Sequence, residues 1–153
     1  MNTQEQITLL FNELAQSSFA IEECAKTDDS WQLKSLDKQL NIVAGLSDDA
    51  SQLTLRCELP HPTTDANQTF ATLLWLNNES AMFGMTLGID EADQPFQIVA
   101  VPTTDLNIAQ MRSYVECFVA RAVFVASMFA GGEDAHAEDS LSARVLIDPS
   151  LFA

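Results

Sequence analysis

The stretch PFQIVAVPTTDLNIAQMRSYVECFVARAVFVASMF, residues 95–129, contains the two elements that decide the fold. Its first part, Phe96 to Val101, is rich in the apolar and β-branched residues typical of a strand. Its second part, from about Leu106 to Phe129, predicts a long helix, because apolar residues recur at alternating steps of four and three. These apolar residues are Met111, Val115, Phe118, Ala122, Val125 and Phe129. At ~1.5 Å per residue such a helix exceeds ~30 Å and can cross a whole sheet.

The chain just before this stretch predicts a hairpin partner and a short helix. Met82 to Asp90 is expected to pair with Phe96–Val101 across an acidic turn, with Phe83, Met85, Leu87 and Ile89 on one face. The small residues Gly84 and Gly88 fall on the other face, where they permit close approach of another element or a bend. The helix, around Ala66 to Leu76, ends in four crowded apolar residues. One face of a helix cannot hide all of these, so part of this surface is expected to meet a second chain or a second layer.

Three strands are predicted further upstream, at Trp31–Leu36, Leu40–Leu46 and Leu53–Leu59. The third is clearest, because Leu53, Leu55, Cys57 and Leu59 alternate with polar residues and so share one buried face.

The first helix is predicted over residues 3–16, with a possible extension toward Ala25. Ile7, Leu10, Phe11 and Leu14 form one apolar stripe, and Thr3 with Gln6 matches a capping box. This stripe has two interpretations. It packs on the protein's own sheet, or it forms with the sheet a groove for a partner segment.

The predicted order is therefore helix, three strands, helix, two strands, helix. It describes a single α+β domain, residues 1–132, with an antiparallel twisted sheet flanked by helices. Residues 133–153 are expected to be an acidic linker and a C-terminal extension, in which the apolar residues of 141–152 dock back weakly.

The chain is strongly acidic, with 22 Asp and Glu residues, seven Lys and Arg residues and a formal net charge of −15. Residues 131–153 hold five of the acidic and one of the basic residues, so the rest of the chain (17 acidic, 6 basic) still carries −11. Because phosphates and anionic lipids attract cations, this charge disfavours nucleic-acid and membrane partners. It also favours solubility of a protein with exposed apolar surface.

No motif for catalysis or metal binding is present. The sequence lacks GxSxG, HExxH, GxGxxG and a glycine-rich phosphate loop, and its two histidines lie between prolines and in the acidic C-terminal stretch. Adjacent acidic pairs fall in predicted loops and helix ends, where a solvated surface is the simpler interpretation. We therefore expect a protein that is not an enzyme and has no cofactor and no metal site.

The three cysteines, Cys24, Cys57 and Cys117, are widely spaced and form no CxxC pair, which favours reduced thiols in a cytoplasmic protein. Cys57 and Cys117 are expected on the apolar faces of their strand and helix, as small hydrophobic side chains. The N-terminal sequence lacks a basic leader, and no apolar run approaches the ~18 residues of a membrane-spanning helix.

Beyond these patterns, the run from LTLRCELP at Leu53 through ATLLWLNNES and AMFGMTLGID to the long helix resembles the type III secretion chaperones of class I, the CesT-like (Tir chaperone) family. In that family a third strand leads into a short helix with an LLxxN-like motif, here Leu73-Leu74-Trp75-Leu76 with Asn77 or Asn78. A two-strand hairpin and a long last helix follow. The resemblance covers most of the chain, although the extension from Gly131 is longer than the family usually has.

The resemblance implies a cytoplasmic bacterial homodimer that holds the N-terminal segment of a secreted effector in extended form, without ATP, and keeps it soluble and competent for secretion. Effector-binding residues are expected on the first-helix stripe and the sheet, at Ile7, Leu10, Phe11, Leu14, Trp31, Leu33, Leu53 and Leu55. The resemblance places the dimer interface on the short helix and the hairpin, at Phe70, Leu73, Leu74, Phe83, Met85 and Leu87.

Two other functions are compatible with parts of the pattern. A chaperone-like regulator would have the same fold and sequester a transcription factor or another secretion component. A small enzyme of the hot-dog type would also combine a long helix with antiparallel strands, but in that fold the helix comes earlier in the chain, and no compelling acid or base is placed for catalysis.

Overall fold

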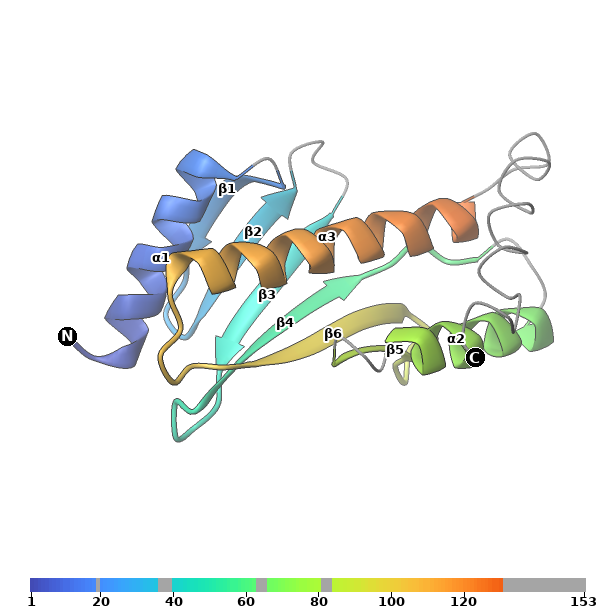
Figure 1. Ribbon diagram of the computed structural model, residues 1–153. Coiled ribbons are helices and arrows are strands. Elements are labelled where there is room, and N and C mark those ends of the chain that lie inside the picture. Colours follow the sequence, from blue (N-terminus) through green and yellow to red (C-terminus); the bar gives the residue numbers. More distant parts are fainter. Residues whose placement is uncertain (19, 36–39, 63–65, 81–83, 131–153) are drawn as a thin grey trace.

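The computed structural model describes residues 1–18, 20–35, 40–62, 66–80 and 84–130 (Figure 1). These residues form three helices and six strands. In chain order they are α1 (Thr3–Ser17), β1 (Ile21–Lys26), β2 (Ser30–Ser35), β3 (Asn41–Leu46), β4 (Gln52–Glu58), α2 (Ala66–Ser80), β5 (Met85–Ile89), β6 (Pro95–Pro102) and α3 (Ile108–Ala130).

The strands form one antiparallel sheet in the order β1-β2-β3-β4-β6-β5. Figure 1 shows α3 crossing one face of this sheet, α1 on the same side at the β1 end, and α2 at the opposite end beside β5. The predicted single α+β domain with an antiparallel sheet is confirmed, and the longest helix comes last.

The core lies between this face of the sheet and the helices. All six residues of the predicted α3 stripe are buried, and so are Leu53, Leu55, Cys57 and Leu59 on the predicted inner face of β4. Both periodicities are therefore confirmed. Burial raises the pKa of the Cys57 thiol to about 12, so this side chain is a neutral part of the core.

Polar contacts within the core fix how the helices sit on the sheet. The Trp31 ring lies against Phe11 with ring centroids 5.6 Å apart, and its indole Nε1 donates a hydrogen bond to Thr8 Oγ1 of α1 at 3.1 Å. At the other end, the buried Gln97 of β6 donates from Nε2 to the carbonyl oxygen of Phe118 in α3 at 2.9 Å. Each hydrogen bond joins a strand to the helix above it, so slippage of either helix would leave a buried polar group unpaired.

The structure corrects the prediction at the N-terminal end. Ile21–Lys26, expected as an extension of the first helix, is strand β1, so four strands precede α2 instead of three. The helix ends at Ser17 because Ser18 turns to an extended conformation, and the following residues pair with β2. The capping box is Asn2 with Glu5, not Thr3 with Gln6: Asn2 Oδ1 accepts from Glu5 N–H at 2.8 Å, and Glu5 accepts from Asn2 N–H at 3.1 Å.

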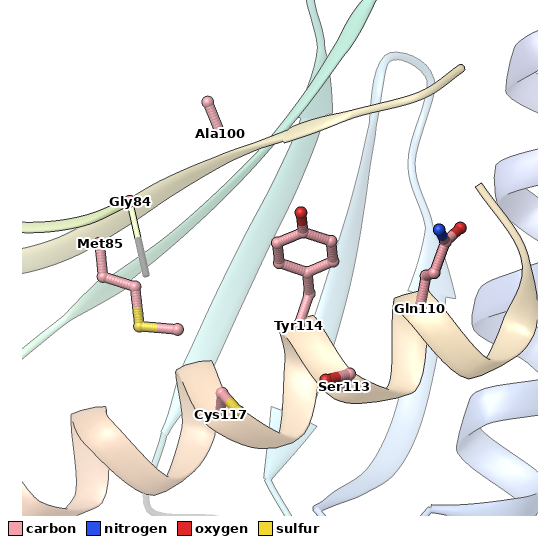
Figure 2. Close-up of a pocket in the computed structure, with 7 residues that line it drawn as sticks. All are labelled: Gly84, Met85, Ala100, Gln110, Ser113, Tyr114 and Cys117. Carbon is pink, nitrogen blue, oxygen red and sulfur yellow. The ribbon is translucent and has the colours of Figure 1, made fainter. Parts of the chain in front are cut away.

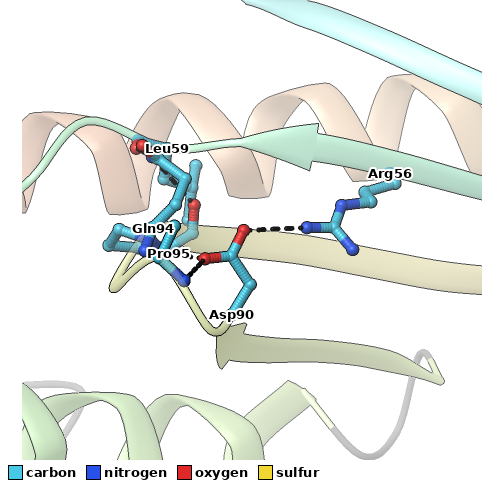
Figure 3. A network of polar contacts seen from close by, with 6 residues as sticks. Arg56, Leu59, Asp90, Gln94 and Pro95 are labelled. Atoms are coloured by element: carbon cyan, nitrogen blue, oxygen red, sulfur yellow. Dashed lines mark hydrogen bonds and ion pairs between the residues drawn. The ribbon is translucent and has the colours of Figure 1, made fainter.

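The outer face of the sheet carries a polar and aromatic stack beside β5. Gly88 lies opposite Phe96, and the Phe96 ring covers it closely enough that a Cβ on Gly88 would be 2.8 Å from Cζ of the ring. The Arg56 guanidinium lies 4.1 Å from the centroid of the same ring and is 3.4 Å from Asp90 Oδ2. Figure 3 shows this ion pair beside the Asp90–Gln94 turn. The close approach expected at Gly88 is confirmed.

Replacement of Gly88 by alanine tests this packing. We expect Gly88→Ala to lower the free energy of unfolding by about 1–3 kcal/mol, because the new methyl group displaces the Phe96 ring and disturbs its contact with Arg56. Gly45→Ala in β3 is the matched control, since a Cβ there meets no atom within 4 Å. Urea unfolding of both variants measures the difference, and equal stabilities would contradict the proposed packing.

Candidate peptide-binding surfaces

The two edges of the sheet differ. At the β5 edge, the Asn77 side chain of α2 takes the place of a neighbouring strand. Its Nδ2 donates to the carbonyl oxygen of Leu87 at 2.8 Å, and its Oδ1 accepts from the Leu87 N–H. Because Asn77 pairs both backbone groups of this residue, a new strand cannot bind Leu87 without first displacing α2.

Removal of the Asn77 side-chain amide should lower the stability of the fold. We expect Asn77→Ala to destabilise the fold by about 1–3 kcal/mol, since it leaves two partly buried backbone groups without partners. Asn78→Ala, at the exposed neighbouring position of the same helix, should change stability by less than about 0.5 kcal/mol. Thermal unfolding of the two variants compares them, and similar melting temperatures would show that Asn77 does not close the edge.

At the other end of the sheet, β1 pairs with β2 on one side and has no strand on its other side within the described residues. Thr27 N–H donates to the carbonyl oxygen of Ser30 at 2.8 Å, toward β2. Backbone groups alternate in direction along an antiparallel strand, so those of Cys24 and Lys26 point away from β2. The exposed charges of Glu22 and Lys26 and a bulge after Ile21 limit non-specific pairing at this edge.

Apolar side chains line the space between this edge and α1. Leu10 of α1 and Cys24 of β1 are partly exposed and pack against the core, and Leu9 is 54% exposed. Burial raises the pKa of the Cys24 thiol, so it behaves here as a neutral, small apolar group. We call the outward backbone of Ile21–Lys26, together with Leu10 and Cys24, the β1 edge. It offers backbone hydrogen bonds and an apolar contact to one extended segment.

The structure places the predicted effector-binding residues mainly in the core. Seven of them have 1% or less of their surface exposed: Ile7, Phe11, Leu14, Trp31, Leu33, Leu53 and Leu55. Of the two interpretations of the first-helix stripe, the structure thus shows packing on the protein's own sheet. Leu10 is accessible to a partner, whereas contact with the other seven requires a helix to move off the sheet. Their role in effector binding stays a prediction.

The residues predicted for the dimer interface divide similarly. Leu73, Met85 and Leu87 are buried within the chain, while Leu74 is 71% exposed. Phe83 and the side chain of Phe70 lie outside the described residues. Leu74 is thus an exposed apolar side chain at the expected place, and self-association through it stays a prediction.

A third surface is a pocket of about 560 Å³ between α3 and the β5–β6 end of the sheet (Figure 2). Figure 2 shows the Tyr114 ring rising from α3 toward the strand that carries Ala100, with Met85 and Cys117 on one side and Gln110 on the other. Gly84 and Ser113 also line it, and none of the lining residues that the structure describes is charged.

Cys117 was expected on the buried face of the long helix, and this expectation is wrong. It is exposed and lines the pocket. Its neighbour Phe118 occupies the buried stripe, and successive residues of a helix are ~100° apart, so Cys117 falls on the flank. The signal that sequence reasoning missed is the spacing of Tyr114 and Cys117, which at three residues apart share one side of α3.

Over the described ranges, no three or more His, Cys, Asp or Glu side chains are grouped to hold a metal ion. None of the helices in the same ranges is long and apolar enough to cross a membrane.

Comparison with known proteins identifies the fold. No protein-family model and no curated protein sequence matches the chain. Among solved structures, it is similar to one in the crystal structure of the ExsC–ExsE complex, with a TM-score of 0.68 and 15% identity over 84% of this chain and 97% of that chain.

Two further structures agree. The type III secretion chaperone SycH of Yersinia pestis, solved with a stable fragment of YscM2, gives a TM-score of 0.59 and 16% identity over 80% of this chain and 98% of that one. The HopA1–SchA chaperone–effector complex gives 0.59 and 15% over 78% and 92%. The chain therefore has the fold found in type III secretion chaperones.

Proposed function

We propose that this chain is a chaperone of type III secretion, a non-catalytic protein that works in the bacterial cytoplasm. It binds the N-terminal segment of an effector in extended form and keeps it soluble and competent for secretion. The observation that carries this proposal is the open β1 edge, a strand without a second neighbour in the described structure, beside a helix with a partly exposed Leu10. The solved complexes of SycH with a YscM2 fragment and of SchA with HopA1 support a polypeptide partner.

Binding at the β1 edge follows the chemistry of strand addition. The outward backbone groups of Cys24 and Lys26 pair with the backbone of the incoming segment, which gives affinity with little dependence on sequence. Alternate side chains of that segment then point toward Leu10 and Cys24, where apolar residues are favoured. A segment with apolar residues at every second position is therefore the preferred ligand.

The net charge of −15 contributes in a different way. An unfolded segment exposes apolar side chains that promote aggregation, and the repulsion between acidic surfaces keeps the resulting complexes apart. The same charge favours a segment with Lys or Arg residues over an acidic one.

Coexpression tests the function itself. N-terminal fragments of about 100 residues, the size of a small domain, are taken from the proteins that the host secretes by its type III apparatus. We propose that at least one of them is insoluble alone and soluble and co-eluting with this chain. Failure of every fragment to bind would contradict the proposal, and capture of a transcription factor or secretion component instead would identify the regulator described in the sequence analysis.

A proline in β1 tests the binding surface. Lys26→Pro removes an outward N–H and places a ring against the incoming strand, and proline is tolerated on the solvent side of an edge strand. We expect about tenfold weaker binding of the effector fragment, equal to about 1.4 kcal/mol. Lys26→Thr is the matched control, because it removes the same charge and keeps the N–H. Calorimetric titration should separate the two variants, and equal affinities would exclude strand addition at this position.

Self-association belongs to the same proposal. The chain forms a homodimer through the α2–β5 end of the domain, where Leu74 exposes 71% of its surface although its helix is packed on β5. An apolar side chain of this size stabilises an interface when it is buried against a second copy.

The substitution Leu74→Ser tests the dimer without disturbing the core. We expect the dissociation constant of the dimer to rise by at least about tenfold, because each protomer loses one buried leucine. The melting temperature of the monomer should stay nearly unchanged, since Leu74 contributes little to the core. Sedimentation velocity over a concentration series measures this, and a monomeric native chain would refute the dimer.

A further inference from the structure

The charges at the β1 edge lie on opposite faces of the sheet. Glu23 is opposite Lys34 of β2, and the two side chains form an ion pair at 3.7 Å in which each is about half exposed. Lys26 is opposite Trp31, whose buried ring contacts Phe11 of α1. Because residues directly opposite each other in a sheet share a face, Glu23 lies on the outer face and Lys26 on the face covered by the helices.

The free part of this edge is short. Its register with β2 shifts between Ile21 and Glu23, so regular pairing begins at Glu23. At the other end, Gln4 Nε2 of α1 donates a hydrogen bond to the carbonyl oxygen of Asp28 at 3.5 Å. An added strand therefore has room for about five residues between these two points, since each of its residues lies opposite one residue of β1.

Each position of an added strand has a different neighbour on β1. The residue opposite Cys24 points toward the helices, where Cys24 packs against the core, so an apolar side chain is favoured there. The residue opposite Glu23 points to the outer face and lies beside a carboxylate. The residue opposite Lys26 points toward the helices and lies beside an ammonium group. Opposite charges directly across a sheet stabilise the pair, and like charges destabilise it.

Neighbouring charges strengthen one of these preferences and weaken the other. Glu22 is exposed and forms no ion pair with the described residues, so two carboxylates at this end of β1 face the single ammonium group of Lys34. At the other end, the acidic turn at residues 28–29 follows Lys26 and offsets its charge. The electrostatic preference for a basic residue opposite Glu23 is therefore the larger of the two.

We propose that the β1 edge selects a segment in which a Lys or Arg residue directly follows the apolar residue that the edge buries. The pairing is antiparallel, as in every described strand pair of the sheet, so the added strand runs from Lys26 toward Glu23. The residue after the one opposite Cys24 then lies opposite Glu23, and this carboxylate lies between the new cation and Lys34. This inference rests on the proposed strand addition and names the class of segment that the edge takes.

A displayed library of random heptapeptides tests this pattern on the full-length chain. Among the peptides that the chain enriches, we expect an apolar residue followed by Lys or Arg to occur at least about threefold more often than the reverse order, within the range of a cross-strand charge pair. Both orders have the same composition, so neither net charge nor hydrophobicity separates them. Lys26→Pro, which removes an outward N–H, should abolish the enrichment.

The substitution Glu23→Gln tests the assigned carboxylate. This variant should keep the enrichment of apolar residues and lose the preference for one order, because the amide is uncharged. Glu58→Gln makes the same change at an exposed position on the outer face of β4, away from the edge, and should keep both preferences. Titration of the most enriched peptide should show about threefold weaker binding to Glu23→Gln at ~0.01 M salt and no difference at ~1 M, where charges are screened beyond ~3 Å.

The results distinguish this inference from the function on which it rests. Equal frequencies of the two orders on the native chain, or an excess of the reverse order, would overturn the charge pattern and leave strand addition in place. Equal enrichment by the native chain and by Lys26→Pro would exclude the β1 edge as the binding surface, and the charge pattern with it, whereas coexpression tests the function independently. Recovery of acidic peptides that resemble Ile21–Lys26 would also overturn the inference, since a second copy of this chain would then be the occupant.

Discussion

The structure depends on the packing of one helix face against one sheet face. The stripe of α3 lies across the inner side chains of β4 and β6, and every member of both sets is buried where the structure describes it. Burial of this apolar surface is the dominant favourable free energy of folding. Gln97 fixes the position of α3 along the sheet, because its hydrogen bond to the Phe118 carbonyl oxygen forms in that position only.

Once that packing is fixed, the surfaces proposed for binding lie where the sheet ends. The β5 edge is closed by Asn77, whereas the β1 edge keeps outward backbone groups beside α1. The β5 edge is therefore suited to packing against α2, and the β1 edge to pairing with an extended segment.

The acidic charge and the apolar surfaces have complementary effects. Leu74 and Leu9 are exposed at opposite ends of the sheet, and such side chains favour association with other polypeptides. A net charge of −15 opposes indiscriminate contact between copies. Association is then favoured only where backbone pairing or close apolar packing outweighs the charge repulsion. This balance suits the proposed binding of one segment at a defined place.

The sequence by itself determined the features that depend on local periodicity. The buried stripe of α3, the inner face of β4, the hairpin of β5 and β6 and the close approach at Gly88 follow from spacings of 3.6 and two residues and from the missing side chain of glycine. The order of elements was predictable for the same reason, except at β1. The segment IEECAK has a weak pattern of its own and becomes a strand through pairing with β2.

Tertiary structure alone decided which apolar residues remain accessible. A stripe such as Ile7, Phe11 and Leu14 has the same appearance whether it faces a partner or the protein's own sheet, and here it faces the sheet. The exposure of Cys117 and the pairing of Leu87 by Asn77 likewise depend on contacts between residues distant in the chain. Local spacing determines which residues share a face, but the packing of the whole chain determines what that face meets.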